Sequence, residues 1–537
     1  MTLSFSDMHF PSRRAPVVAG NGLVATSQPL AAQAGLAVMQ AGGNAIDAAV
    51  ATVATLCVVE PCSTGIGGDA FALIWSAAEG RLFGLNASGP APAGLTADLV
   101  RGQGHTTFPA RGGLPVTVPG ALRGWQLALE RFGTRGLDTL LARPIDYAAN
   151  GYPVSPGIAA AWERSTELLG RLPDSRRVWL PGGRAPRATE RFRNPEFAAT
   201  LRAIAAQGYD AFYTGSIAER IAAAVRADGG VMTAGDLAAY RAEWVEPIAV
   251  TYGDGYVFHE IPPNGQGVAA LLALNIVRGF GLGDMAYGSA DYYHVLIEAM
   301  KLAFADAHAY IGDPRRVDVP VGGLLSPGYA RERRALIAKD RALFPEPGRP
   351  PRDGDTVYLT TADAAGNMVS WIQSLYMGFG SGITAADTGV QLQNRGANFS
   401  LERGHPNEVA PGRRPYHTII PGFISRNGRP WASFGVMGGF MQPQGHLQVG
   451  VNLVDFGMDP QAALDAPRFN WLQGREVALE PGIGPDVRAV LSRRGHALWP
   501  LGAAVHYGGG QVILRDDDSG VLVGGAEPRN DGAAVGY

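Results

Sequence analysis

"DGDTVYLTTADAAGNMVSW", residues 353–371, is typical of a two-stranded hairpin. β-Branched and aromatic residues flank an Ala-Ala-Gly-Asn turn, after which the apolar alternation resumes. The first strand opens on the pair Asp355-Thr356. Threonine is common in strands, so the stretch alone is compatible with a purely structural Thr356. The segments around the hairpin decide whether this residue also has a chemical role.

Upstream of the hairpin the sequence predicts helices. Residues 31–60 contain two helical stretches split by a Gly-Gly pair, and Asn44 is placed to cap the second stretch. That second stretch is apolar nearly all round, so we expect it to be buried. The spacing of apolar residues predicts an amphipathic helix that starts at Ser289 and ends at the Gly312-Asp-Pro sequence.

A segment of different composition separates these helices from the hairpin. Residues from about 340 to 355 are Pro-rich, charged and without periodicity, which predicts an exposed linker. After it we expect a helix at 452–467 and short strands at 356–362, 368–376, 389–393, 418–424 and 430–436. Helices, then a linker, then a strand-rich remainder indicate mixed α and β layers.

The composition excludes several classes of function. The chain has 537 residues, 46% of them hydrophobic, so it can bury a large core. Its formal net charge is −3 and it has no block of basic residues, so no nucleic-acid partner is expected. No window of about 18 consecutive apolar residues is present, and the start of the chain lacks a secretory signal pattern. A cytoplasmic location without membrane association is therefore expected.

Motifs for metal, nucleotide and serine-hydrolase chemistry are missing from the sequence. There is no HExxH, CxxC, Walker or GxSxG motif, and the ten His residues have no metal-ligand spacing. Cys57 and Cys62 are the only cysteines, and we expect both to be small buried apolar residues. No metal and no cofactor are expected.

Thr356 offers a different kind of chemistry. If the chain were cut between Asp355 and Thr356, the new α-amino group would have a pKa of about 7.7 to 8.0, which suits a general base. One residue would then supply both the base and the hydroxyl nucleophile. Gly438-Gly439, just after an apolar strand, could present two N–H groups to the oxyanion. With 73 glycines, roughly twice the usual share of about 7%, the glycine pair alone is weak evidence.

These pieces are similar to a known family. The chain resembles the γ-glutamyltransferase family of N-terminal nucleophile hydrolases over essentially its whole length. The matching segments, in family order, are MQAGGNAIDAAVATVATLCVVEP, GIGGDAF, EAMKLAFADAHAYIGDP, DTVYLTTADAAGNMVS, GFGSGI, GVMGGF and DFGMDPQAALDAPRF. The resemblance implies an α+β fold, a four-layer αββα sandwich formed by two subunits from one self-cleaved precursor. A helix-rich large subunit would span residues 1–355 and a small subunit residues 356–537.

The resemblance also implies roles for catalytic residues. Thr356 matches the nucleophile, and Gly438 and Gly439 match the oxyanion hole. Ser374 stands where the family often has a second Thr that supports the nucleophile. Self-cleavage would be an N-to-O acyl shift, in which the Thr356 hydroxyl attacks the Asp355 carbonyl and water then hydrolyses the ester.

Substrate recognition departs from the family pattern. The Arg that clamps an α-carboxylate is replaced at about Ser88, and the Asp for an α-ammonium is replaced by Asn398. The Ser-Ser pair that binds glutamate in the family is replaced by His417 and Thr418. An Asn that contacts glutamate is replaced by Tyr376, and a neutral side chain is replaced by Arg395.

These replacements point to an acyl group that carries a carboxylate and lacks an α-ammonium, because an unpartnered buried charge costs about 2 to 5 kcal/mol. Oxamate-type and glutaryl-type amides both fit. Arg395 could instead form a structural ion pair with Glu402 or Glu408, and His417 could simply pack.

The leading hypothesis is therefore a self-processing amidohydrolase that forms an acyl-Thr356 intermediate. Its partners would be a small-molecule amide and water, or secondarily an amine, as acyl acceptor. The large and small subunits would pair, with further oligomerisation left open. One alternative is a genuine γ-glutamyltransferase or glutathione hydrolase acting on γ-glutamyl amides. Another, from a different class, is a catalytically inert binding protein in which Thr356 is only a strand residue.

Overall fold

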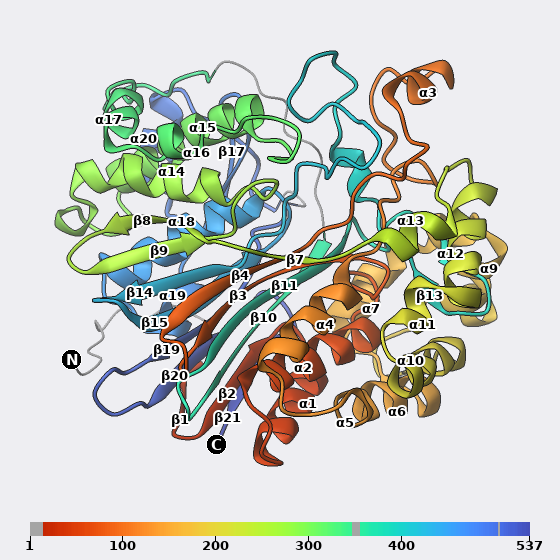
Figure 1. The fold of residues 1–537 in the computed structure, drawn as a ribbon. Coiled ribbons are helices and arrows are strands. Elements are labelled where there is room, and N and C mark those ends of the chain that lie inside the picture. The colour runs from red at the N-terminus through yellow and green to blue at the C-terminus, as the bar shows by residue number, and fades with distance from the viewer. Residues whose placement is uncertain (1–13, 346–354, 503–504) are drawn as a thin grey trace.

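Two seven-stranded β-sheets stack face to face, and helices cover the outer face of each sheet (Figure 1). This computed structural model describes residues 14–345, 355–502 and 505–537. The expected α+β fold with four αββα layers is confirmed. Every neighbouring pair of strands within the two large sheets is antiparallel.

The first large sheet, called the hairpin sheet, contains the predicted hairpin near its centre. Its strands, in spatial order, are β21 (Ala533–Gly536), β2 (Gly22–Thr26), β10 (Asp355–Asp363), β11 (Met368–Tyr376), β3 (Asp69–Ser76), β4 (Arg81–Ala87) and β7 (Glu243–Val245). The second sheet has the order β1 (Val17–Ala19), β20 (Leu522–Ala526), β19 (Gly509–Arg515), β15 (Arg429–Met437), β14 (Gly422–Arg426), β9 (Tyr256–Glu260) and β8 (Ile248–Tyr252). Both sheets combine strands from before and after residue 355.

The helices form two layers. Those packed with the hairpin sheet are α1 (Pro29–Gln40), α2 (Ala45–Val59), α4 (Ala121–Phe132), α5 (Leu137–Leu140), α6 (Ala142–Asn150), α7 (Pro156–Glu163), α8 (Thr166–Gly170), α9 (Pro173–Trp179), α10 (Pro195–Gln207), α11 (Asp210–Tyr213), α12 (Gly215–Ala227) and α13 (Ala234–Ala239). Those packed with the second sheet are α14 (Gly267–Val277), α15 (Ala290–Tyr310), α16 (Val321–Leu324), α17 (Pro327–Arg334), α18 (Met441–Val454), α19 (Pro460–Asp465) and α20 (Pro485–Arg493). Within the described parts of the chain, every helix is too short or too polar to cross a membrane.

Smaller elements complete the fold. Helix α3 (Ala97–Gly102) projects from the edge of the molecule (Figure 1). Four 3₁₀ turns are η1 (Pro181–Gly183), η2 (Arg278–Phe280), η3 (Leu282–Asp284) and η4 (Arg395–Asn398). Three small sheets pair β5 (Tyr152–Pro153) with β6 (Arg191–Phe192), β12 (Thr384–Ala385) with β13 (Val390–Gln391), and β16 (Phe469–Gln473) with β17 (Glu476–Leu479) and β18 (Ala497–Leu498).

Strand β10 is buried on both faces. Val357 and Leu359 point into the core shared with the helices, whereas Tyr358 points into the core between the two sheets. A strand that is covered on both sides needs apolar residues at nearly every position, which explains its continuous apolar run. Thr356 also faces the second sheet, because its hydroxyl bonds Ser374, which shares a strand face with Ile372 of that inter-sheet core.

The expected helices before the hairpin are confirmed. The Asn44 side chain accepts hydrogen bonds from the backbone N–H groups of Ile46 and Asp47, both at 2.9 Å, and so caps α2. Every residue of α2 is buried, as its apolar composition predicts. Helix α15 ends at Tyr310, two residues before Gly312.

The helix expected at 452–467 is correct only in part, because the segment is not one continuous helix. Helix α18 ends at Val454 and α19 starts only at Pro460, because Gly457 between them has a φ of +58°. Helix α18 was not expected from the sequence, because its glycines weaken helix propensity. Both are required by packing, since a β-carbon at Gly445 or Gly450 would lie within about 2.6 Å of the side chains of Val436 or Phe258, respectively.

Two expected strands are shorter or shifted. The strand expected at 418–424 starts only at Gly422, and the one expected at 389–393 is reduced to Val390–Gln391. The exposed linker expected from about 340 also needs correction, because Ala342 is 4% exposed. Residues 346–354 of that linker lie outside the described residues.

The chain just before this gap is tied to α15. Leu343 donates its backbone N–H to Glu298 at 2.7 Å, and its carbonyl accepts from Lys301 Nζ at 3.2 Å. Glu298 and Lys301 are themselves an ion pair at 2.7 Å with both side chains fully buried. These contacts explain why this part of the segment is ordered against the helix layer although its composition is that of a linker.

Candidate active site

Thr356 lies at an irregularity in the hairpin. In the β10–β11 ladder Asp355 pairs with Tyr376 and Val357 pairs with Gln373, so the register shifts at Thr356. Such bulges re-aim a side chain. Thr356 is 3% exposed, and its hydroxyl donates a hydrogen bond to Ser374 Oγ at 3.2 Å.

Ser374 connects Thr356 to a third strand. Its hydroxyl oxygen also accepts a hydrogen bond from the Tyr376 backbone N–H at 2.7 Å. In the β11–β3 ladder Ser374 is directly opposite Asp69. Three neighbouring strands thus bring Thr356, Ser374 and Asp69 to the same end of the hairpin sheet.

Contacts between the two sheets place the glycine pair that follows β15. The ring of Tyr358 leaves no room for a β-carbon at Gly435, and the hydroxyls of Thr360 and Ser433 are hydrogen-bonded. Strands β10 and β15 therefore run in opposite directions where they face each other, since residue numbers rise along β10 as they fall along β15. Continuing by two residues on each strand brings Thr356 level with the end of β15, where the glycine pair begins.

Gly438 and Gly439 form a turn that leads into α18. Their φ angles are +123° and +59°, values that glycine adopts without strain. Their carbonyls accept hydrogen bonds from the N–H groups of Met441 and Gln442 at the start of the helix. Neither glycine N–H donates to another residue that the structure describes. Two donors at the positive end of a helix dipole suit a developing oxyanion.

Arg395 is a fully buried cation in η4. Its Nη1 donates to Thr418 Oγ1 at 2.6 Å, and its guanidinium carbon lies 4.4 Å from the centre of the Tyr376 ring. Burial lowers the pKa of Arg395 to about 10, so the side chain stays charged at neutral pH. The proposed ion pair with Glu408 is wrong, because Glu408 pairs with Arg101 at 3.0 Å. No other acidic residue in the described chain forms an ion pair with Arg395, so the alternative with Glu402 is also wrong.

The free edge of Arg395 has a defined geometry. Its Nε and Nη2 have no acceptor among the described residues. The same two nitrogens bind a carboxylate side-on at two other places in this protein. Arg315 binds Asp313 at 2.9 and 2.6 Å, and Arg529 binds Glu480 at 2.6 and 2.5 Å. The open edge of Arg395 is therefore the edge that accepts a carboxylate in a bidentate manner.

Asn398 and Tyr376 lie beside this cation. Asn398 is three residues after Arg395 in a 3₁₀ turn, a spacing that places the two on one face. Its side-chain oxygen and nitrogen are buried without a partner in the described chain. Tyr376 has a φ of +81°, which is unusual for a bulky residue, and its ring supports the Arg395 guanidinium.

Asp69 is a site residue that sequence reasoning missed. It is fully buried, and its carboxylate accepts from the Gly89 N–H at 2.9 Å, Gln393 Nε2 at 2.9 Å and His417 Nε2 at 3.1 Å. Burial raises the pKa of Asp69 to about 7, although the nearby Arg395 lowers it. The available signal was an acid that opens a strand buried on both faces, since a carboxylate there needs specific partners.

His417 is neutral and oriented by its partners. Burial, with Arg395 and Arg414 nearby, holds the pKa of His417 well below its usual value. Its Nδ1 accepts from the Ile419 N–H at 3.4 Å, so Nε2 carries the proton and donates to Asp69. The ring also packs edge-on against Phe71 at 4.8 Å, so His417 has both a packing and a polar role.

Gln266, a second missed residue, links the two halves of the site. Its Nε2 donates to the carbonyls of Thr418 at 2.6 Å and Gly439 at 2.9 Å. Ser88, the approximate position expected to replace an Arg of the family, donates its hydroxyl to Asn86 at 2.7 Å. Hydrogen bonds and packing contacts therefore connect the expected site residues, and they add Asp69 and Gln266. The Asn398 side chain is the exception, since only its position in η4 places it beside Arg395.

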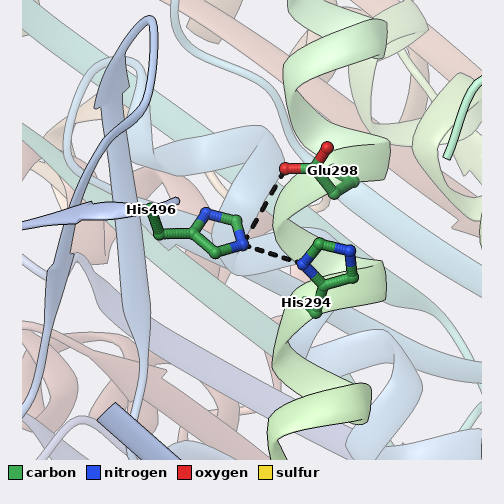
Figure 2. A group of neighbouring side chains, drawn as sticks. All are labelled: His294, Glu298 and His496. Carbon is green, nitrogen blue, oxygen red and sulfur yellow. Dashed lines mark hydrogen bonds and ion pairs between the residues drawn. The ribbon is translucent and has the colours of Figure 1, made fainter. Parts of the chain in front are cut away.

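A separate cluster in the helix layer has the composition of a metal site. His294, Glu298 and His496 each offer one ligand atom, and these atoms lie within 4.8 Å of one another (Figure 2). The imidazoles are hydrogen-bonded to each other at 2.8 Å, and His294 Nε2 bonds the Ala338 carbonyl at 2.8 Å. The ammonium of Lys301 already binds the Glu298 oxygen that faces the cluster. A divalent cation would have to displace this buried positive charge, so the group is better described as a hydrogen-bond network.

Breaking this network should destabilise the protein strongly. We expect Lys301→Met to lower the free energy of unfolding by about 3 to 5 kcal/mol, because Glu298 would remain buried without its counter-charge. Denaturant titration followed by tryptophan fluorescence measures the change. Arg81→Met is the control, since it breaks an exposed ion pair with Glu246 and should cost less than about 1 kcal/mol. Equal shifts for the two variants would contradict a stabilising role for the buried pair.

The chain is similar to a known protein family, to two proenzymes and to a solved structure. The family model described as Gamma-glutamyltranspeptidase matches residues 31–537. A glutathione hydrolase-like YwrD proenzyme of Bacillus subtilis is 38% identical over 97% of this chain and 99% of its own length. An oxamate amidohydrolase proenzyme of Klebsiella pneumoniae is 37% identical over 97% of this chain and 99% of its own length. The crystal structure of cephalosporin acylase from Bacillus halodurans superposes with a TM-score of 0.93 at 50% identity, covering 100% of this chain and 99% of that one.

Proposed function

The chain belongs to the gamma-glutamyltranspeptidase family, and from this premise we propose that it is a self-processing amidohydrolase with Thr356 as its nucleophile. As a member of this family it is an amidohydrolase or acyltransferase, and the alternative of an inert binding protein is set aside. The proposal divides the chain into a large subunit of residues 1–355 and a small subunit of residues 356–537. The proenzyme names of the relatives support such a division.

In the proposed maturation the Thr356 hydroxyl attacks the Asp355 carbonyl. The peptide bond becomes an ester by an N-to-O shift, and water hydrolyses the ester to release the Thr356 amine. The hydrogen bond to Ser374 supports this role because it orients the hydroxyl. The two fragments would stay together, since β10 pairs with β2, β11 with β3, and β14 with β9 across the cut.

In the proposed turnover the liberated amine removes the proton of the Thr356 hydroxyl, which attacks the amide carbonyl. The N–H groups of Gly438 and Gly439 stabilise the oxyanion. The substrate's amine then leaves with the proton that the Thr356 α-amine had taken from the hydroxyl. Water, activated by the same amine, then hydrolyses the acyl-Thr ester and returns the free enzyme. Transfer to an amine acceptor would replace water in this last step.

The proposed substrate is an amide whose acyl group carries a carboxylate. The open Nε and Nη2 edge of buried Arg395 is the observation that carries this proposal. Thr418 and Tyr376 fix that guanidinium, and the unpartnered amide of Asn398 adds further donors and acceptors. Oxamate-type and glutaryl-type amides fit these groups, and the name of the oxamate amidohydrolase relative agrees with this class.

A second candidate substrate is a γ-glutamyl amide, and the name of the glutathione hydrolase-like relative supports this candidate. It would need an anionic partner for the α-ammonium, and Asn398 has no charge. Hydrolysis of glutaryl, oxamate and γ-glutamyl amides with one leaving amine, together with the butyryl amide, tests the proposal. We expect the glutaryl or oxamate amide to give the highest kcat/KM and the butyryl amide to be poor. A preference for the γ-glutamyl amide over its glutaryl analogue would support the second candidate instead.

The glycine turn offers a test of the oxyanion role. We expect Gly438→Ala to lower kcat by on the order of 10²- to 10³-fold, because a β-carbon at φ +123° would lie 2.9 Å from His506 and shift the turn. Steady-state kinetics of the processed enzyme measure the loss. Gly428→Ala is the matched control, since its φ is +76° but a β-carbon there meets nothing within 4 Å. A Gly438→Ala enzyme with unchanged kcat would remove the glycine turn from the mechanism.

A further inference from the structure

Asp69 and Arg395 are opposite charges in one buried site without a direct ion pair. Asp69 is fixed by three hydrogen-bond donors, one of them His417 Nε2. Arg395 is fixed by Thr418 and Tyr376 and keeps its Nε and Nη2 edge open. Without substrate, the cation and the ionised acid balance each other's charge through space.

A substrate carboxylate at Arg395 would change this balance. Two carboxylates and one guanidinium would then lie in one buried site. Solvent would not screen their charges, since Asp69 and Arg395 are both 0% exposed. Two buried like charges disfavour each other's ionised form. The substrate carboxylate would hold both open N–H groups of Arg395, so Asp69 is the acid that loses its charge at lower cost.

We propose that Asp69 takes up a proton from solvent when a carboxylate-bearing acyl group binds to Arg395, so that substrate binding is linked to proton uptake. The inference rests on the proposed function, because it assumes that Arg395 holds the acyl carboxylate. It makes Asp69 a specificity-determining residue. An acyl group with an ionised carboxylate binds only when the Asp69 side chain is neutral.

The other titratable groups around Asp69 do not compete for the proton. Arg414 is paired with Glu243, and burial raises the pKa values of Tyr213 and Tyr240, which stay neutral. Burial together with the two arginines keeps the pKa of His417 well below the usual value. The α-amine of Thr356 in the processed enzyme also titrates near neutral pH. It responds to the carboxylate at the reaction centre, so a ligand that carries this carboxylate alone measures its contribution separately.

The sign of the pH dependence follows from Asp69. Its pKa of about 7 means that Asp69 is largely ionised above pH 7 and largely neutral below it. An anionic ligand favours the neutral form, so its binding is strongest at acidic pH and weakens as pH rises. Above pH 7 the dissociation constant should rise by about tenfold per pH unit until the pKa of the complex is reached.

Calorimetry of the processed wild-type enzyme tests the linkage directly. Glutarate, oxalate and butyrate are titrated in two buffers of different ionisation enthalpy, which gives the number of protons taken up. Butyrate shares the carboxylate that faces Thr356 but lacks the second one, so it serves as the matched ligand. For the better dicarboxylate we expect uptake in excess of that for butyrate, approaching one proton at pH 8 and about one tenth of that at pH 6. Dicarboxylate binding with the same proton uptake as butyrate would overturn the inference.

Two variants assign the proton. Asp69→Asn should reduce the uptake for the dicarboxylate to that for butyrate. The ratio of the two affinities should then be independent of pH and close to the wild-type ratio at pH 6. His417→Gln should retain the uptake, and its loss in that variant alone would reassign the proton to the imidazole. If neither dicarboxylate binds more tightly than butyrate at any pH, the proposed substrate class fails, and the linkage fails with it. Tight binding without proton uptake, by contrast, overturns only the linkage.

Discussion

Replacing Thr356 with alanine is expected to stop both self-cleavage and amide hydrolysis. The hydroxyl attacks in both reactions, and the amine that serves as base in turnover exists only after cleavage. Loss of a nucleophile that acts together with its base typically lowers kcat by roughly 10⁴- to 10⁶-fold. Denaturing gel electrophoresis should show fragments of 355 and 182 residues for the wild type and one band of 537 residues for the variant.

Two control variants separate chemistry from packing at this position. Thr356→Ser keeps the hydroxyl and the amine, so it should still cleave and turn over, at a lower rate because the loss of the methyl group loosens χ1. Thr360→Ala removes a buried hydroxyl four residues along the same strand and should leave cleavage intact. A Thr356→Ala chain that still splits before residue 356 would end the nucleophile assignment.

The sequence contains much of the fold because its main elements follow local rules. The hairpin follows from its turn and its β-branched residues, and α2 follows from the cap at Asn44 and an apolar run. Helix α18 could not be predicted in the same way. Its glycines at 445 and 450 reflect the closeness of Val436 and Phe258, which only the folded chain brings near. Tertiary packing there overrides helix propensity.

In the candidate site too, some residues were predictable from local sequence and others depend on tertiary contacts. Thr356, Ser374 and the glycine pair stand in segments whose order along the chain resembles a known family. The open edge of Arg395 could not be predicted, because it depends on which acids lie nearby after folding. Asp69 was missed for a related reason, since its partners Gln393 and His417 are 324 and 348 residues away in sequence. Such contacts leave no periodic signal in the sequence.

Substitution of Arg395 should change which amides the enzyme accepts. We expect Arg395→Met to lower kcat/KM for glutaryl or oxamate amides by roughly 30-fold to several-thousand-fold, which corresponds to about 2 to 5 kcal/mol for an unpartnered buried carboxylate. The butyryl amide has no such carboxylate, so its kcat/KM should change little. Arg395→Lys keeps the charge but lacks the Nε and Nη2 fork, and it should fall between the two.

The ratio of kcat/KM for the acidic and neutral amides is the decisive measurement, because a general distortion of the site would lower both values and leave their ratio unchanged. Arg101→Met is the matched control, since Arg101 also binds a carboxylate, that of Glu408 at 3.0 Å, but makes no contact with Thr356 or Ser374 in the described structure. Its ratio should equal that of the wild type. If Arg395→Met lost activity equally on both amides, Arg395 would be a structural cation and the acyl carboxylate would bind elsewhere.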